Sequence, residues 1–240
     1  MSIKLNRSKK RHLLLSILYK LDKIMPFSNA AKMKLYLDLE WIFERFAHEK
    51  SFRVFAHGDH PVRNLSTSFL EKHLSKEHKV LDLGCNTGEL TFLISKHADK
   101  VTGIDNNVGF VDEAIKRYSS AGIDFVCDDA EKFLQKNDRR FEVLILSHIL
   151  EHLDDPQSLL SGYQKFFDYI YVEVPDFERT HLNIYRQHLG SSLIYSDADH
   201  IWEFDRRDML SLLSSSGLTV LDCEFRLGVQ KYWCRTGSTK

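Results

Sequence analysis

The hydrophobic positions of the chain indicate two helices near the start, followed by a regular alternation of strands and helices. The stretch 12–25 is amphipathic and ends at Pro26, and the stretch of about 29–49 is rich in Leu, Trp and Phe. After residue 65, short apolar runs that predict strands alternate with helical patterns. The expected helices are 65–75, 88–97, 108–119, 129–135, 156–166 and 206–215. The expected strands are 79–83, 100–104, 123–127, 141–146, 169–174, 218–225 and 229–234.

This alternation predicts an α/β fold with a mostly parallel sheet and helices on both faces. We expect a helical and basic N-terminal extension at 1–64 and one α/β domain at 65–240. Residues 175–205 form a long insertion after the fifth predicted strand, rich in histidine and tyrosine. Long non-repetitive insertions in compact domains are usually lids or binding loops, so we expect this one to lie over a ligand site.

The loop after the first predicted strand carries the clearest chemical signal. Residues 80–88 read VLDLGCNTG, an apolar strand that contains Asp82 and runs into glycines at Gly84 and Gly88. Glycines let the backbone approach a ligand closely, and the following helix points its N-terminal amides at the same place. In open α/β sheets this crevice at the carboxyl ends of the strands is where ligands bind.

The same loop departs from the dinucleotide fingerprint G-x-G-x-x-G, because Asn86 and Glu89 stand at the second and third glycine positions. Asp82 and Glu89 would repel a pyrophosphate and would suit a ligand with cationic groups. S-adenosylmethionine carries a sulfonium and an ammonium group and no phosphate. The loop therefore favours this ligand and argues against a nicotinamide-dependent oxidoreductase.

Two further predicted strands end in acidic residues. Asp105 ends the second strand, where a carboxylate can accept hydrogen bonds from both ribose hydroxyls, and Asp128 and Asp129 follow the third strand, placed to meet an adenine amino group. Three predicted strands that end in acidic residues are a more specific indication of this ligand than one glycine loop.

At these residues the chain resembles the class I S-adenosylmethionine-dependent methyltransferases, in particular the small-molecule group with an E-H-L-x-D-P segment after the fourth strand. The matching segments are 81–88, Gly103–Asp105, Asp129–Glu131, Glu151–Pro156, Glu173–Pro175 and His200–Phe204. The resemblance covers roughly residues 65–236. It implies a Rossmann-like seven-stranded sheet with an antiparallel seventh strand, and S-adenosyl-L-methionine as the cofactor.

The resemblance also implies a set of cofactor-binding residues in the loop and at the strand ends. They are Asp82, Gly84, Cys85, Asn86, Gly88, Asp105, Asn106, Asp129, Ala130 and Ser147. Asp82 would face the ammonium directly or through water, Asp105 would bind the ribose hydroxyls, and Asp129 with Ala130 would meet the adenine.

Methyl transfer depends mostly on orientation, and a base is needed only for a weakly acidic acceptor such as a hydroxyl. The candidate catalytic residues are His148, Glu173, His181 and His200. The sequence does not choose among them, and structural roles for His148 and His200 remain open.

Residues 148–152 also match the zinc-peptidase pattern H-x-x-E-H. Because the stretch directly follows a predicted buried strand, where a turn should begin, we expect no metal site from this pattern.

The net charge of −1 argues against a nucleic-acid partner. The charge is uneven: residues 1–60 hold 12 Lys and Arg against 6 Asp and Glu, a net of +6, and the remainder holds 21 against 28, a net of −7. The basic start and the amphipathic stretch 12–25 leave two interpretations open, a helix packed on the domain or peripheral contact with the inner face of a membrane.

Four cysteines without C-x-x-C spacing indicate reduced thiols and a cytoplasmic protein, and we expect no transmembrane helix and no secretory signal.

The predicted function is methylation, at an oxygen atom, of a small molecule or of a sugar unit of a glycan or glycolipid. The alternatives are a non-catalytic regulatory protein that binds the cofactor and a methyltransferase that acts on protein or RNA. Oligomeric state is not predicted.

Overall fold

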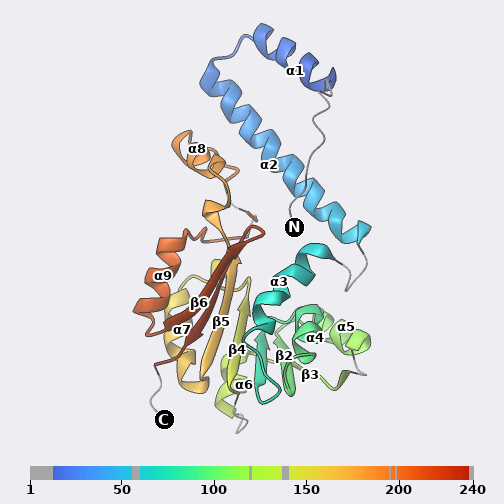
Figure 1. Cartoon of the computed structure of the whole chain (residues 1–240), viewed down its shortest axis with the longest axis vertical. Coiled ribbons are helices and arrows are strands. Elements are labelled where there is room, and N and C mark those ends of the chain that lie inside the picture. The colour runs from blue at the N-terminus through green and yellow to red at the C-terminus, as the bar shows by residue number, and fades with distance from the viewer. Residues whose placement is uncertain are drawn as a thin grey trace.

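The centre of the molecule is a seven-stranded sheet, shown in Figure 1 by a computed structural model that describes residues 13–55, 60–118, 121–136, 141–194, 196–197 and 199–237. The strands lie in the order β3-β2-β1-β4-β5-β7-β6. Their bounds are β1 Lys79–Leu83, β2 Lys100–Asp105, β3 Asp124–Cys127, β4 Val143–Ser147, β5 Tyr169–Pro175, β6 Thr219–Arg226 and β7 Val229–Arg235. The strands β1 to β5 pair in parallel, and β7 is antiparallel to both β5 and β6. The predicted seven-stranded, mostly parallel sheet is therefore confirmed.

Helices cover both faces of this sheet (Figure 1). Their bounds are α3 Pro61–Glu71, α4 Glu89–Ser95, α5 Val108–Tyr118, α6 Ala130–Lys136, α7 Pro156–Tyr163 and α9 Arg206–Ser215. Single turns of 3-10 helix occupy Leu150–His152, Gln164–Phe166 and Phe177–Arg179. The predicted helices are all present, with ends shifted by a few residues.

The alternation of side chains along each strand divides the core into two clusters. Leu81 and Leu144 face one side, where they pack with residues of α6, α7 and α9, and Val80 and Ile145 face the other side, with residues of α3 and α4. All four side chains are fully buried. Strands buried on both faces read as continuous apolar runs, which is why their positions could be read from the sequence.

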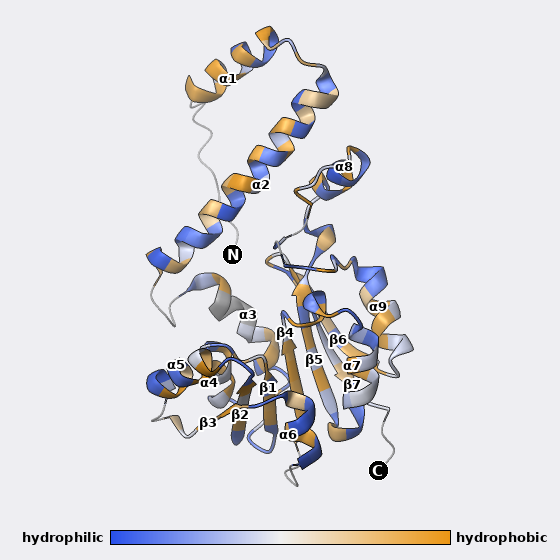
Figure 2. Cartoon of the chain, turned by 180° about the vertical axis from the view of Figure 1, so that it is seen from behind, coloured by the Kyte–Doolittle hydropathy of each residue, from blue (hydrophilic) through white to orange (hydrophobic). Residues whose placement is uncertain are grey.

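The N-terminal extension consists of two helices, α1 Leu13–Ile24 and α2 Asn29–Val54, which project away from the sheet (Figures 1 and 2). Ser28 begins α2, with its hydroxyl accepting a hydrogen bond from the Ala31 amide at 3.2 Å. The predicted helix at 29–49 is thus longer, ending at Val54. The basic cluster within residues 1–12 lies outside the described residues.

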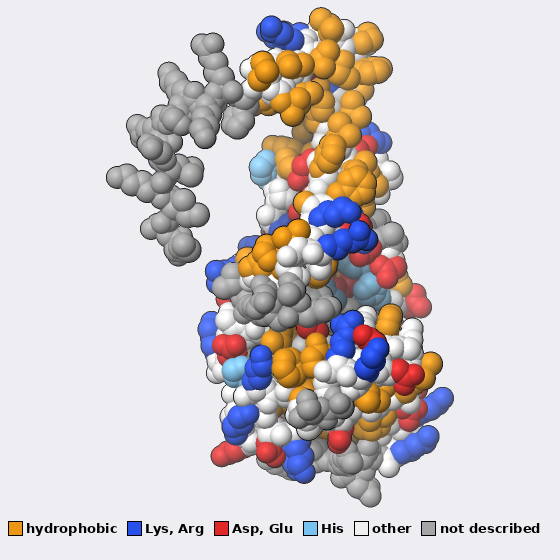
Figure 3. Space-filling model, turned by 90° about the vertical axis from the view of Figure 1, so that its right-hand side faces the viewer, with side chains coloured by type: hydrophobic (Ala, Val, Ile, Leu, Met, Phe, Trp, Pro, Cys, Tyr) orange, Lys and Arg blue, Asp and Glu red, His pale blue; other side chains and the backbone are white. Residues whose placement is uncertain are grey.

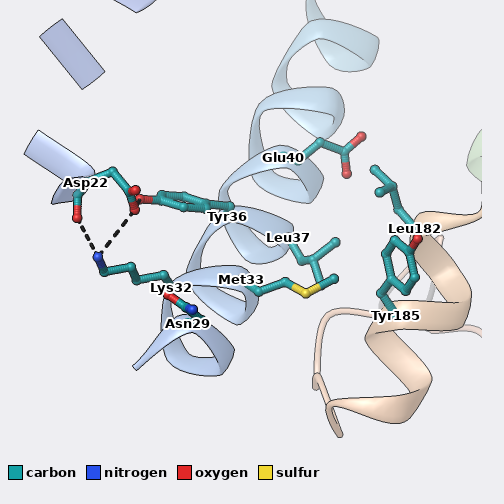
Figure 4. Close-up of a pocket in the computed structure, with 9 residues that line it drawn as sticks. All are labelled: Asp22, Asn29, Lys32, Met33, Tyr36, Leu37, Glu40, Leu182 and Tyr185. Carbon is teal, nitrogen blue, oxygen red and sulfur yellow. Dashed lines mark hydrogen bonds and ion pairs between the residues drawn. The ribbon is translucent and has the colours of Figure 1, made fainter. Parts of the chain in front are cut away.

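The end of α1 is tied to α2 by polar contacts, which Figure 4 shows in close-up. The Tyr36 hydroxyl donates to the Asp22 carboxylate at 2.6 Å, and the Lys32 ammonium lies 3.6 Å from the same carboxylate. A hollow of about 380 Å³ adjoins this junction, bounded on its other side by Leu182 and Tyr185. Across the described ranges, no helix has the length and apolar character needed to span a bilayer.

The insertion after β5 contains a helix that the sequence analysis did not predict, α8 Leu182–His188. It supports α2 through Arg186, which is 1% exposed. The Arg186 guanidinium donates to the Leu37 carbonyl at 3.1 Å and pairs with the Glu40 carboxylate. Helix α2 is therefore held against α8 of the insertion.

Candidate functional site

A cavity of about 760 Å³ opens between α2 and the carboxyl ends of β1, β4 and β5. The loop after β1 lines one side of it. The floor is formed by Ser147 at the end of β4, by His148 directly after it, and by Glu173 of β5. The insertion contributes Arg179 and His200. The cavity lies at the sheet edge that the glycine loop had indicated.

The loop after β1 has a backbone shape that its glycines make accessible. Gly84 and Gly88 have positive φ angles of 70° and 78°, and the amide of Gly84 donates to the Ile104 carbonyl at 2.8 Å. A Cβ atom on Gly84 would lie 2.5 Å from Ile149, and one on Gly88 would lie 2.7 Å from Phe125. Both positions therefore favour glycine for their positive φ, and Gly88 also needs it for space, because the Ala114 Cβ atom would lie 2.9 Å away as well.

Asp82 places a buried carboxyl group beside this loop. It is 2% exposed and its Oδ2 atom accepts a hydrogen bond from the Thr91 hydroxyl at 2.6 Å. Burial raises the pKa of Asp82 to about 7, with the nearby charge of Asp105 adding to the effect. A cation bound next to Asp82 would stabilise its carboxylate form and so offset the free-energy cost of ionising a buried acid.

Asp105 holds the loop against the end of β2. Its Oδ2 accepts from the Asn86 amide and its Oδ1 from the Asn107 amide, both at 2.9 Å. A carboxylate has about four acceptor positions, so Asp105 keeps capacity for further donors.

The residues predicted to bind the cofactor divide into two groups. Those that line the cavity are Asp82, Gly84, Cys85, Asn86 and Ser147. Those outside its lining, as far as the described residues define it, are Gly88, Asp105, Asn106, Asp129 and Ala130. The second group stands at the start of α4 and just after the neighbouring strands β2 and β3, and the Asp129 carboxylate accepts from the Lys132 amide at 3.0 Å in the first turn of α6.

His148 occupies the cavity floor in a left-handed backbone conformation, with φ of 55°. Its amide donates to the Glu173 carbonyl at 2.8 Å, Nδ1 lies 3.0 Å from Glu151 Oε1, and Nε2 lies 3.5 Å from Glu173 Oε1. The His148 side chain is 45% exposed. Desolvation by the surrounding chain opposes its protonation, but the two carboxylates outweigh this effect and raise the pKa of His148 to about 10. His148 is therefore protonated at neutral pH and can donate hydrogen bonds.

Glu173 is the partner of this imidazolium. It is 8% exposed and also accepts a hydrogen bond from the Tyr171 hydroxyl. Burial favours the neutral acid, yet the contact with His148 lowers the pKa of Glu173 overall. Glu173 is therefore ionised at neutral pH.

The other two histidine candidates lie in different surroundings. The His200 side chain is only 6% exposed, reaches the cavity lining and places Nδ1 at 2.9 Å from Glu203. His181 packs edge-on against Tyr185, with ring centroids 5.5 Å apart, and is not among the residues found to line the cavity.

Helix α2 supplies the roof of the cavity, and none of its residues was predicted from the sequence to belong to the site. The contributing residues are Trp41, Glu44, Arg45, His48 and Phe52. Two ion pairs join this roof to the insertion, Arg45 with Asp197 at 2.8 Å and Arg179 with Glu44 at 2.9 Å. The spacing of the five α2 residues along the chain is that of one face of a helix. This spacing was the signal available from the sequence.

Comparison with known proteins decides the family. A family model described as a methyltransferase domain matches residues 55–222, which is more than half of the chain. The chain belongs to the class I S-adenosylmethionine-dependent methyltransferases. The predicted family and its cofactor, S-adenosylmethionine, are thereby confirmed.

Among curated relatives, a ubiquinone biosynthesis O-methyltransferase of Coxiella burnetii is 31% identical over 106 residues, which cover 43% of this methyltransferase and 45% of the relative. One from Histophilus somni is 37% identical over 92 residues, covering 36% and 39%. The chain thus spans less than half the length of these relatives.

Solved structures share the fold. Magnesium protoporphyrin IX methyltransferase from Synechocystis PCC 6803, with bound S-adenosylhomocysteine, aligns with a TM-score of 0.56 at 14% identity, covering 73% of this methyltransferase and 82% of that chain. A S-adenosylmethionine-dependent methyltransferase from Clostridium acetobutylicum ATCC 824 aligns with a TM-score of 0.54 at 15% identity, covering 82% and 100%. These likenesses concern the fold alone.

Proposed function

We propose that this methyltransferase transfers a methyl group from S-adenosylmethionine to an oxygen atom of a small molecule. The observation that carries the proposal is the single cavity that joins the acidic glycine loop to His148, Glu173 and His200. The names of the curated relatives, which are O-methyltransferases, support an oxygen acceptor.

The residues of the loop fit the cofactor. The buried Asp82 suits the ammonium group, and the backbone at Gly84 admits a ligand at close approach. Asp105, with remaining acceptor capacity at the end of β2, suits the ribose hydroxyls. When bound, the cofactor supplies a methyl group on a positively charged sulfur atom. We keep Asp129 and Ala130 as the proposed adenine contacts.

The chain contributes orientation and proton handling to this transfer. Held by the loop after β1, the cofactor would supply its methyl carbon to an acceptor oxygen, and the electron pair of the broken bond would remain on its sulfur atom. We assign to the His148 imidazolium a hydrogen bond that holds this oxygen, and to the ionised Glu173 the removal of the hydroxyl proton. His200 is proposed to position the acceptor from the insertion side.

The roof of the cavity supports an acceptor with both polar and flat apolar parts. Trp41 and Phe52 supply aromatic surface, and the two ion pairs to the insertion supply donors and acceptors nearby. Because hydroxylated rings present one apolar face and a polar rim, a sugar unit of a glycan or glycolipid fits this lining.

We further propose that α1 rests on an anionic membrane surface. Its apolar side chains are exposed, among them Leu14 at 69% and Leu18 at 51%, and they cover the outer end of the extension in Figure 3. Positive charge accompanies them, because Lys20 and Lys23 lie on the same helix and residues 1–12 are basic.

Calorimetric titration with S-adenosylhomocysteine tests the cofactor site. We expect binding by the wild type and a loss of more than tenfold in affinity for Asp105→Ala, because hydrogen bonds to a charged group contribute roughly 1.5–3 kcal/mol. Asp112→Ala, which removes an exposed acid on α5, is the matched control and should bind like the wild type. Unchanged affinity in Asp105→Ala would overturn the ribose assignment.

Transfer of labelled methyl groups to a panel of phenols and sugars then tests the acceptor class. Methylated oxygen in a product supports the proposal. Product formed only on protein or RNA would contradict it.

A further inference from the structure

Three potential metal ligands meet beside the cavity. Glu151, His152 and His200 each offer one ligand atom, and these atoms lie within 4.8 Å of one another. Glu151 and His152 belong to the single helical turn after β4, and His200 comes from the insertion. The backbone holds the two segments together, because the amides of Ile201 and Trp202 donate to the Glu151 carbonyl at 2.8 and 3.1 Å.

The Glu151 carboxylate is incompletely satisfied. Its side chain is fully buried, and Oε1 faces His148 at 3.0 Å. Its other oxygen, Oε2, is buried without a hydrogen-bond partner among the residues that the structure describes. Because a buried acceptor without a partner is destabilising, above all when it is charged, this atom needs a binding partner. A cation at the cluster would supply it.

The two histidines are oriented as metal ligands are. His200 Nδ1 lies 2.9 Å from the Glu203 carboxylate, and His152 Nδ1 lies 3.5 Å from the Asp199 carboxylate. A carboxylate on one ring nitrogen fixes the tautomer and leaves the other nitrogen to bind a metal. The Nε2 atoms are therefore the ones free to serve as ligands.

We propose that Glu151, His152 and His200 bind a divalent transition-metal ion such as Zn²⁺. Two imidazole nitrogens and one carboxylate oxygen suit a borderline cation, and three protein ligands leave a coordination position open. Tetrahedral bonds near 2.0–2.1 Å require ligand atoms about 3.3 Å apart. The three ligand atoms, now within 4.8 Å of one another, must therefore come closer when the ion binds, and His152 has the most exposed side chain of the three, at 35%.

This site is distinct from the H-x-x-E-H arrangement of zinc peptidases. His148 takes no part, because its left-handed backbone turns the ring toward Glu151 Oε1 and Glu173. His200 replaces it, and only the folded insertion brings that residue to Glu151 and His152.

The location also suggests a role, which rests on the proposed oxygen methylation. His148, in contact with Glu151, and His200 both line the cavity. In this role, an acceptor oxygen occupies the open coordination position and is held there for transfer.

Metal titration of the chelator-treated, full-length protein tests the site without any methyl transfer. We expect one equivalent of Zn²⁺ to bind, and Co²⁺ to bind with the visible absorption of a four- or five-coordinate ion. Mg²⁺ should bind much more weakly, because it prefers oxygen ligands. His152→Asn should lower Zn²⁺ affinity at least 100-fold, and Glu203→Gln should lower it about 10- to 100-fold.

His97→Asn is the matched control, since His97 pairs with one carboxylate, Glu71, outside the cluster. It should bind Zn²⁺ like the wild type. Glu151→Gln is compared with the wild type once circular dichroism shows that it has a native fold. The substitution of the partly exposed His152 tests the site without altering a buried residue. Absence of Zn²⁺ uptake, or uptake unchanged in His152→Asn, would refute the site. Because S-adenosylhomocysteine binding is measured separately, such a failure leaves the proposed function standing.

Discussion

At the scale of single residues, the site depends on ionisable side chains whose protonation is set by the fold. His148 and Glu173 hold each other in their charged forms at the cavity floor, whereas Asp82 is buried with its pKa raised. The protonated His148, whose side chain is 45% exposed, compensates the charge of the buried Glu173. The buried Asp82 has no such cationic partner among the described residues, and it is the group whose charge a bound ligand should change.

Asp82 therefore predicts a pH-dependent affinity for the cofactor product. Its pKa rises from 3.8 to about 7 in the free protein, so the carboxyl group is largely protonated at pH 5.5. The ligand ammonium stabilises the carboxylate, so binding releases a proton and affinity rises with pH. We expect S-adenosylhomocysteine to bind about tenfold more tightly at pH 7 than at pH 5.5.

Calorimetry in buffers of different ionisation enthalpy measures the released proton directly. Asp82→Asn should bind weakly and lose the pH dependence between 5.5 and 7. If that variant kept the wild-type profile, another group would be responsible.

At the scale of elements, α1 and α2 have different tasks. The α2 helix places an aromatic and charged face over the cavity and makes ion pairs with the insertion. The α1 helix has no buried residue, and its leucines face outward. An exposed apolar helix of this kind needs a covering surface, and its positive charge favours anionic lipid.

Co-sedimentation with vesicles containing phosphatidylglycerol tests this element. The double variant Leu14→Asp with Leu18→Asp should bind the vesicles at least tenfold more weakly, because each buried leucine contributes roughly 1.5–3 kcal/mol. Ile115→Asp, an exposed apolar position on α5, should bind like the wild type. Equal binding by the double variant would exclude α1 as the contact, and self-association of the wild type without vesicles would point to a second copy as the covering surface.

At the scale of the whole molecule, the extension and the domain are joined through a buried charge. Arg186 is 1% exposed, and its guanidinium meets the Glu40 carboxylate and the Leu37 carbonyl of α2. Removing one partner of such a group leaves the other charge buried and unpaired.

Glu40→Ala should therefore lower the free energy of unfolding by about 1–3 kcal/mol, as measured by urea denaturation. Glu49→Ala removes an exposed carboxylate that pairs with Arg45 one helical turn away, and it should cost less than about 0.5 kcal/mol. Equal effects of the two substitutions would show that Arg186 does not couple α2 to the insertion.

The sequence by itself determined the alternation of strands and helices, the glycine loop and the acids at the strand ends. These features are local: apolar periodicity, a turn that needs Gly84 and Gly88, and acids placed where strands stop. These features suffice to predict the fold and the family, because each element can be recognised from a few neighbouring positions in the sequence.

Only the tertiary structure decided which distant residues meet. In the folded chain, α2 lies over the cavity and His181 lies outside the residues found to line it. His200 lies next to Glu151 and His152. The tertiary structure also gave His148 a left-handed backbone, and with it two carboxylate partners. Such contacts depend on how the insertion folds back across the strand ends. The local periodicity of the sequence does not predict this course of the chain.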